Sequence, residues 1–119
     1  HEYCTGVNTD TRTISSGELF IALQGNTFDG HHFLNDACIN GASMVIISER
    51  FSFKAVPRTV SVILVKNTQT ALEALAHFYR MKFDIPVVAV TGSNGKTTTK
   101  NMIAALVASK LNVCATQKN

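Results

Sequence analysis

Residues 87–99 read VVAVTGSNGKTTT, an apolar run followed by a turn with two glycines and then by a lysine. The apolar run at residues 87–90 predicts a buried strand, residues 91–95 form the turn, and residues 96–111 are expected to be a helix. Free backbone N–H groups at the start of such a helix, together with the positive end of its dipole, attract phosphate. The order strand, turn, helix therefore predicts a nucleotide-binding loop in a parallel α/β sheet.

The side chains of this loop have roles that the chemistry of phosphate binding predicts. Glycine in the turn lets the backbone approach phosphate oxygens without a Cβ in the way. Lys96 supplies a positive charge to the β- and γ-phosphates, and the Thr97 hydroxyl suits Mg²⁺. We therefore expect both residues to be catalytic and Thr97 to be a metal ligand. The residues expected to bind ATP are Gly92, Ser93, Asn94, Gly95, Lys96, Thr97 and Thr98.

The loop departs from the standard pattern G-x-x-x-x-G-K-[ST], which would need glycine where this chain has Val90. An ordinary glycine turn with an incidental lysine is the alternative interpretation. The apolar strand before the turn and the apolar residues 102–107 after it favour the phosphate loop. A further strand is expected at residues 112–116, which completes a β–loop–α–β unit.

The chain before this loop predicts a small α/β domain. Strands are expected at residues 18–23, 44–47 and 60–65. The last two runs are almost wholly apolar, as in parallel strands that helices cover on both faces. A short helix is expected from about His32, with Gly41 at its C-terminal end.

A longer helix follows, in which Thr70 and Glu73 have capping-box spacing. Its core-facing side is expected to consist of Leu72, Leu75, Ala76 and Tyr79. Pro86 disfavours helix at the preceding residue and marks a boundary. The sequence thus predicts a first domain at residues 1–84 and the start of a second at residues 85–119.

The composition restricts the class of protein. The 119 residues are 45% hydrophobic and 16% charged, which is typical of a globular protein. A net charge of +3 without runs of like charge gives no support for a nucleic-acid or membrane-surface partner. No segment approaches the ~20 apolar residues of a membrane span. The three cysteines form no C-x-x-C pair, so a reducing compartment, the cytoplasm, is expected.

Residues 91–98, TGSNGKTT, resemble the nucleotide loop of the Mur ligases, which lacks the early glycine in the same way. The front of the chain also resembles this family. Asp10-Thr11-Arg12, GELFIALQG at residues 17–25 and DGHHF at residues 29–33 are similar to its D-S-R, G-D-L-F-V-A-L-x-G and D-G-H-x-F elements. The likeness spans residues 7–119, and Thr11 keeps the hydroxyl of the usual serine.

The resemblance implies that the first domain holds the UDP end of a muramoyl peptide. Thr11 and Arg12 are then candidates for the nucleotide end, because an arginine fork suits a diphosphate. The loop at the mouth of that pocket would consist of Gly25, Asn26, Asp29, Gly30 and His31, and His31 is also a weak candidate for a general base. A purely structural role is the alternative for each of them, since Asp10 and Asp29 can form turns with their own backbone.

The resemblance further implies an ATP- and Mg²⁺-dependent, amide-forming ligase of peptidoglycan precursor synthesis. Lys100-Asn101-Met102 favour the member that joins D-Ala-D-Ala to UDP-MurNAc-tripeptide through an acyl phosphate. That enzyme is expected to be a cytoplasmic monomer with this chain as its front part. Residues 1–119 alone are expected to be inactive. Their second part is expected to pack on the first domain, to associate with another copy, or to be one piece of a longer ordered protein.

Two alternatives stay open. One is the family member that adds the third peptide residue, whose loop commonly reads T-G-T-N-G-K-T-T where this chain has Ser93. The other is a UDP-sugar-binding module without catalysis.

Overall fold

The computed structural model describes residues 4–54 and 56–117. The chain divides into two compact units, with the boundary between Phe83 and Asp84. None of the helices in the described ranges is long and apolar enough to cross a membrane.

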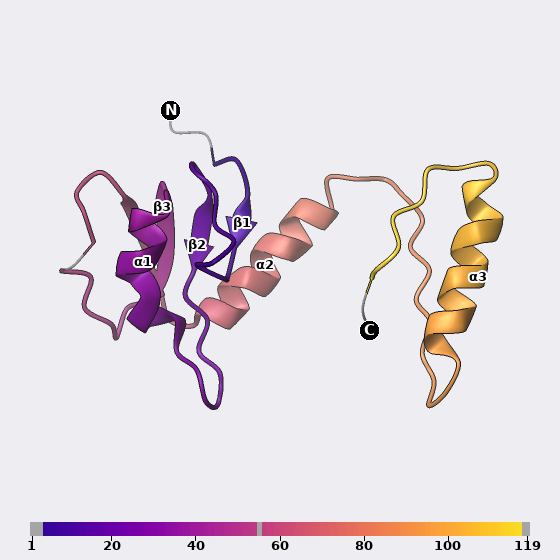
Figure 1. Ribbon diagram of the computed structural model, residues 1–119, viewed down its shortest axis with the longest axis horizontal. Helices are drawn as coiled ribbons and strands as arrows, with labels where there is room; N and C mark the ends of the chain where they lie inside the picture. The colour runs from indigo at the N-terminus through magenta and orange to yellow at the C-terminus, as the bar shows by residue number, and fades with distance from the viewer. Residues whose placement is uncertain (1–3, 55, 118–119) are drawn as a thin grey trace. The chain divides into compact units, whose positions relative to one another are not determined.

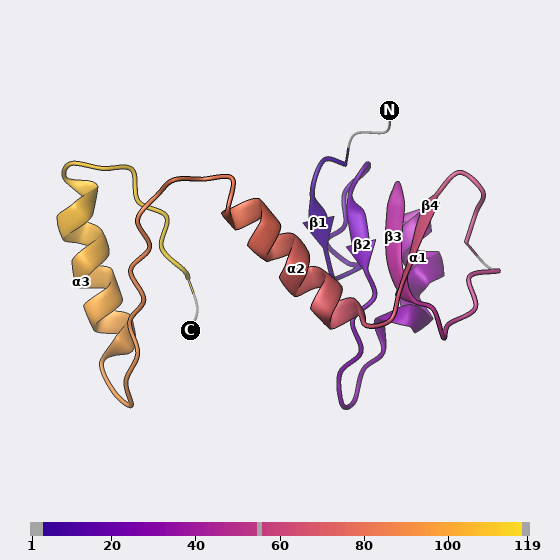
Figure 2. The same ribbon diagram turned by 180° about the vertical axis from the view of Figure 1, so that it is seen from behind.

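The first unit is built on a parallel sheet of four strands whose spatial order follows the chain. The strands are β1 (Val7–Asn8), β2 (Leu19–Ile21), β3 (Met44–Ser48) and β4 (Ser61–Val65) (Figure 1; β4 is labelled in Figure 2). Phe20 of β2 lies opposite Val45 of β3, which lies opposite Val62 of β4. The α/β class with parallel strands is therefore confirmed.

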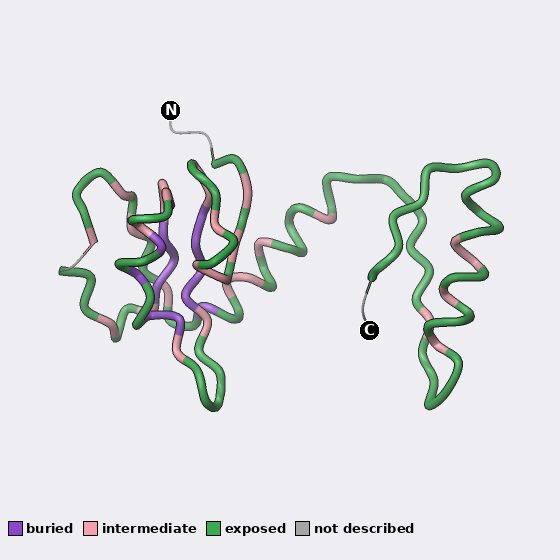
Figure 3. Tube along the Cα trace, in the orientation of Figure 1, coloured by how far each residue is buried: buried purple, intermediate pink, exposed green. Residues whose placement is uncertain are grey.

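Helices cover the two faces of this sheet. Because successive strand residues point to opposite faces, Phe20 and Val45 pack with Leu34 of α1 (Leu34–Ile39), which follows the 3-10 turn η1 (Gly30–Phe33). On the other face, Leu19, Ile21 and Ile46 pack with Leu72 and Leu75 of α2 (Thr68–Arg80). The buried residues accordingly gather on β2, on β3 and on α1 (Figure 3).

The three strands predicted in this unit are confirmed: β2 and β4 are shorter than predicted, and β3 is one residue longer. Their expected burial has one exception. β3 is buried, but Ile63 and Leu64 of β4 are 41% and 47% exposed. The expectation that helices cover β4 on both faces is wrong, because β4 is the edge strand and α2 contacts β3. β1 was not predicted, since two residues are too few to give a period-two pattern.

The two helices of this unit also refine the sequence expectations. Gly41 has a φ of +107° directly after α1, as a C-terminal glycine should. Asn67, and not Thr70, caps α2, since its Oδ1 accepts a hydrogen bond from the Thr70 N–H at 3.0 Å. The predicted core-facing side of α2 is confirmed for Leu72 and Leu75. The prediction is wrong for Ala76 and Tyr79, which are exposed. The last turns of α2 extend past the strands (Figure 1).

The second unit contains α3 (Lys96–Ala108), which begins at the predicted residue. The strands predicted at residues 87–90 and 112–116 are wrong: the described part of this unit holds no strand. A strand needs a paired neighbour for its backbone groups, and Val87 and Val88 stay 67% and 68% exposed. No residue of α3 is buried, although the Lys100 ammonium donates a hydrogen bond to the Thr116 carbonyl.

Gly30 shows how tightly the turn before α1 packs on the sheet. A Cβ there would lie 3.0 Å from the backbone N and O of Leu23. We expect Gly30→Ala to lower the free energy of unfolding by about 1–3 kcal/mol, because backbone atoms must shift. Gly25→Ala is the matched control, since its Cβ would meet nothing closer than the Phe28 carbonyl at 3.7 Å. Urea unfolding of both variants measures the difference, and equal losses would contradict this account of the packing.

Candidate functional site

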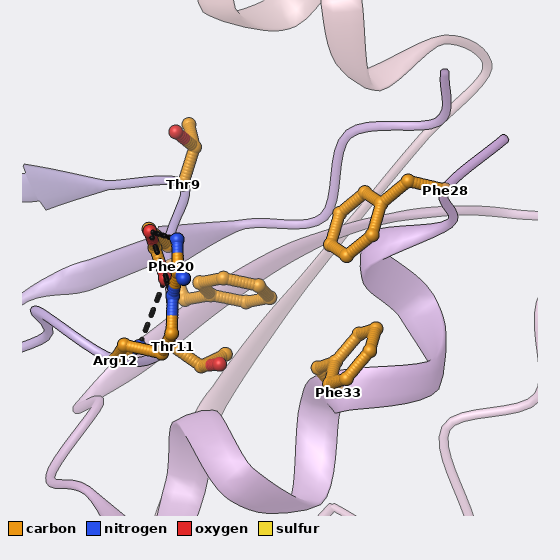
Figure 4. A pocket seen from close by; sticks show the side chains of 7 residues that line it. Thr9, Thr11, Arg12, Phe20, Phe28 and Phe33 are labelled. Carbon is orange, nitrogen blue, oxygen red and sulfur yellow. Dashed lines mark hydrogen bonds and ion pairs between the residues drawn. The ribbon is translucent and has the colours of Figure 1, made fainter. Parts of the chain in front are cut away.

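The first unit contains a cavity of about 610 Å³ at the carboxyl ends of its strands. Such strand ends are where ligands bind in parallel α/β sheets. The segment after β1 forms the polar side of the cavity. The aromatic side is formed by Phe20 of β2, by Phe28 in the loop before η1 and by Phe33 at the end of η1 (Figure 4). The lining residues are Thr9, Asp10, Thr11, Arg12, Phe20, Phe28 and Phe33.

The aromatic side of the cavity consists of one buried ring and two accessible rings. Phe28 and Phe33 are stacked with ring centroids 5.2 Å apart and an interplanar angle of 16°. Phe28 is 52% exposed, whereas Phe20 is buried and fixed in the core. Exposed, preoriented rings suit a flat ligand ring. The sequence motifs did not identify these three residues as part of a site. A phenylalanine inside the polar loop at residues 24–30 could have indicated an exposed aromatic ring there.

The polar side of the cavity is organised by a pair between Asp10 and Arg12. The Arg12 Nε donates to Asp10 Oδ1 at 2.9 Å and to Oδ2 at 3.2 Å, and Nη2 donates to Oδ2 at 2.5 Å. The Arg12 N–H also donates to Asp10 Oδ1 at 3.0 Å, which closes a turn. The Arg12 side chain remains 86% exposed, so its charge is presented to solvent at the cavity. Asp10 thus orients the guanidinium that a ligand anion would meet.

The pair also sets the charge state of the carboxylate. Hydrogen bonds from the Arg12 side chain and backbone lower the pKa of Asp10 from its ordinary 3.8 to about 2. A lowered pKa means that the contribution of Asp10 to stability is present above pH 3.8 and is lost as the pH falls through about 2.

We expect the Asp10 carboxyl carbon, followed by NMR, to titrate with a midpoint near pH 2. In Arg12→Ala the midpoint should return toward 3.8, because the side-chain donors are gone. The Glu18 carboxyl serves as an internal control that should not move between the two proteins, because hydrogen bonds from Ser15 and Asn8, and not from Arg12, lower its pKa. An Asp10 midpoint that is the same with and without Arg12 would contradict the pairing.

The loop between β2 and α1 lies beside the cavity. It folds back on itself through a hydrogen bond from the Gly25 N–H to the Phe28 carbonyl at 2.7 Å and a bridge between Gln24 and Asp29. Of the predicted loop residues, Asn26 is exposed at the tip, and Gly30 is buried against β2.

His31 is also buried, and both of its ring nitrogens are hydrogen-bonded within the protein. Of the residues predicted to bind the UDP end, Thr11 and Arg12 line the cavity. The five loop candidates, which are Gly25, Asn26, Asp29, Gly30 and His31, are not part of that lining.

The second candidate site is the loop before α3. Gly92 and Gly95 have φ angles of +151° and +75°, which favour glycine over residues with a Cβ. Gly95 caps the helix without a side-chain hydrogen bond, and the first turn holds no acidic residue. The first N–H groups of a helix have no acceptor within it, so this end can receive an anion. The Lys96 ammonium bends back over the loop and donates to the Gly92 carbonyl at 2.7 Å.

These features fit a polyphosphate. The backbone N–H groups and the Lys96 charge lie at one helix end, and the Thr97 hydroxyl follows in the first turn. In the described ranges no three His, Cys, Asp or Glu side chains gather around a point where they could hold a metal. The Thr97 hydroxyl and the phosphate oxygens of a nucleotide are oxygen ligands of the kind that Mg²⁺ takes.

The chain matches two family models. Residues 3–80 match the model "Mur ligase family, catalytic domain", and residues 90–119 match "Mur ligase middle domain". The cavity lies within the first match and the loop before α3 within the second.

Three similar proteins illustrate the likeness. The UDP-N-acetylmuramoyl-tripeptide--D-alanyl-D-alanine ligase of Synechocystis is 43% identical over 93% of this chain, and that of Bacillus subtilis is 44% identical over 96%. A crystal structure of MurF ligase from Thermotoga maritima in complex with ADP has a TM-score of 0.74 and 35% identity, covering 87% of this chain and 23% of that one. The chain spans 24% of the length of each of the two ligases.

Proposed function

We propose, because the chain belongs to the Mur ligase family, that it forms the front part of an ATP-dependent ligase that joins D-Ala-D-Ala to UDP-MurNAc-tripeptide. One observation carries this most strongly: the two compact units each hold a site suited to a different phosphate-bearing ligand. The names of the Synechocystis and Bacillus subtilis ligases, which are 43% and 44% identical to this chain, support the choice of substrates.

The first domain, proposed at residues 1–84, is proposed to bind the UDP end of the substrate in the cavity of the first unit. Arg12 is the exposed cation at the cavity and suits the diphosphate, which it can bind through two N–H groups. The stacked rings of Phe28 and Phe33 offer a surface for the flat uracil ring. Thr11 adds a hydroxyl between these two parts of the cavity lining.

The second domain, proposed to start at residue 85, is proposed to hold the phosphates of ATP at the loop before α3. The backbone N–H groups of residues 92–98 and the Lys96 ammonium would surround the β- and γ-phosphates, and the Thr97 hydroxyl would hold Mg²⁺. ATP supplies the phosphoryl group that activates the substrate carboxylate for attack by the amine. Lys96 would orient that group and stabilise the charge that develops on it. The complex of the Thermotoga maritima ligase with ADP supports a nucleotide in such proteins.

The whole enzyme is proposed to act on small molecules in the cytoplasm, as a monomer. A ligase that adds the third peptide residue is the first alternative, and Ser93 and residues 100–102 favour the D-Ala-D-Ala ligase over it. A UDP-sugar-binding module without catalysis is the second. The open helix end with its lysine favours an enzyme, because such a module has no need of a second phosphate site.

Calorimetric titration of the purified whole protein with UDP and with Mg²⁺-ATP tests the ligase against the UDP-sugar-binding module. The ligase requires that both nucleotides bind and that saturation with one leaves a site for the other. Binding of UDP without any affinity for ATP would favour the module and would contradict the ligase.

A further inference from the structure

His31 occupies an unusual position for a polar side chain of this loop. It is 4% exposed, and its ring packs on Phe51 with centroids 4.8 Å apart. The backbone N–H of Ser48, at the end of β3, lies 2.9 Å from Nε2. Because a backbone N–H can only donate, Nε2 must carry the lone pair, and the neutral ring then bears its hydrogen on Nδ1. That hydrogen is directed to Asp29 Oδ1 at 2.6 Å.

These bonds attach the loop to the sheet. Asp29 Oδ1 accepts from both the His31 backbone N–H and the His31 ring, so the carboxylate holds the turn and orients the imidazole. Burial raises the pKa of Asp29, but the hydrogen bonds from His31 outweigh it and leave this pKa lowered. The other ring nitrogen reaches the end of β3. His31 is therefore a bridge between the loop and β3.

The bridge belongs to the segment that carries the aromatic side of the cavity. Phe28 and Phe33 stand three residues before and two residues after His31, and they are the two stacked rings that line the cavity. Neither ring is buried in the core, since Phe28 is 52% and Phe33 is 37% exposed. Their placement thus depends on the segment that carries them, and His31 attaches that segment to β3 without lining the cavity itself.

We propose that His31 is a positioning residue for the UDP-linked substrate: through Ser48 and Asp29 it holds the loop so that Phe28 and Phe33 face the bound nucleoside. His31 itself does not touch the substrate. This inference rests on the proposed function, and it assigns His31 a role distinct from that of a general base. A general base would need a ring nitrogen free for the reacting group, and both nitrogens are already hydrogen-bonded.

A matched pair of substitutions tests this in the whole ligase. The amide of His31→Asn can replace Nδ1 as donor to Asp29 but is too short to accept from Ser48. The longer His31→Gln places an acceptor near Nε2 and keeps the bond to Ser48. We expect His31→Asn to raise the KM for the UDP substrate roughly tenfold, with kcat and the KM for ATP within twofold of wild type. His31→Gln should recover most of that loss.

His32→Asn and His32→Gln are the controls, because His32 is exposed on the same turn and does not line the cavity. They should leave all three kinetic constants within twofold. Folding of each variant is checked by its thermal midpoint. If His31→Asn does not fold, Asp29→Ala replaces it, since that change removes the acceptor that orients the ring and should also raise the KM for the UDP substrate.

The outcomes separate the inference from the proposed function. A folded His31→Asn, or Asp29→Ala in its place, with an unchanged KM for the UDP substrate overturns the positioning role and leaves the ligase intact. A fall in kcat with KM unchanged overturns it also, since that result indicates direct participation in the reaction. A wild-type enzyme that does not use the UDP substrate overturns the proposed function and this inference with it.

Discussion

Replacing Lys96 by alanine is expected to reduce kcat of the whole ligase by about 10²–10³-fold, which corresponds to roughly 2.7–4 kcal/mol of transition-state stabilisation. Lys96 is the cation of the loop before α3, where its ammonium lies against the Gly92 carbonyl. Binding of the UDP substrate should stay within twofold of wild type, because that substrate is assigned to the other unit. Phosphate release and calorimetry measure the two effects on the same preparation.

Lys110→Ala is the control for the loss of one positive charge. Lys110 follows α3 and is exposed, away from the loop at the start of that helix. It should retain full activity. If Lys96→Ala keeps activity within a few-fold of wild type while folded, the loop has no part in the reaction.

Replacing Arg12 by alanine is expected to raise the KM for the UDP substrate by roughly ten- to a hundredfold. The loss of a charge-assisted contact to phosphate is worth about 1.5–3 kcal/mol. The KM for ATP should not change, since Arg12 belongs to the cavity of the first unit. Steady-state kinetics with each substrate varied in turn give both constants.

Arg58→Ala is the matched control, because Arg58 is an exposed arginine of the same unit that does not line the cavity. Its KM for the UDP substrate should stay within twofold. An Arg12→Ala enzyme with both KM values raised equally would assign Arg12 to the fold, through its pair with Asp10, and not to the substrate.

The fold was predictable from sequence where a local pattern reports the packing. The runs of β3 and β4 were found because they are almost wholly apolar, α2 because its apolar residues recur at helical spacing, and the start of α3 because a glycine turn precedes it. The exposure of β4 could not be predicted, because an edge strand and a central strand can have the same apolar composition. The strand at residues 87–90 was predicted from local composition, but a strand forms only with a paired neighbour.

Of the two candidate sites, one could be predicted from the sequence and the other only in part. The loop at residues 92–98 could be identified because one helix end carries all its groups. The cavity joins residues 9–12 to three phenylalanines from other segments, and only the fold brings them together. The role of His31 depends on a bond to Ser48, seventeen residues away, which no local pattern indicates.

The most direct test of the ligase is its product. The whole enzyme is incubated with UDP-MurNAc-tripeptide, Mg²⁺-ATP and D-Ala-D-Ala, and mass spectrometry follows the peptide while phosphate release is counted. The account predicts one amide-linked UDP-MurNAc-pentapeptide for each phosphate, and no product when D-Ala-D-Ala is omitted. It would be contradicted if the tripeptide stayed unchanged in this mixture, while a parallel incubation of the enzyme with UDP-MurNAc-dipeptide, Mg²⁺-ATP and a diamino acid gave UDP-MurNAc-tripeptide.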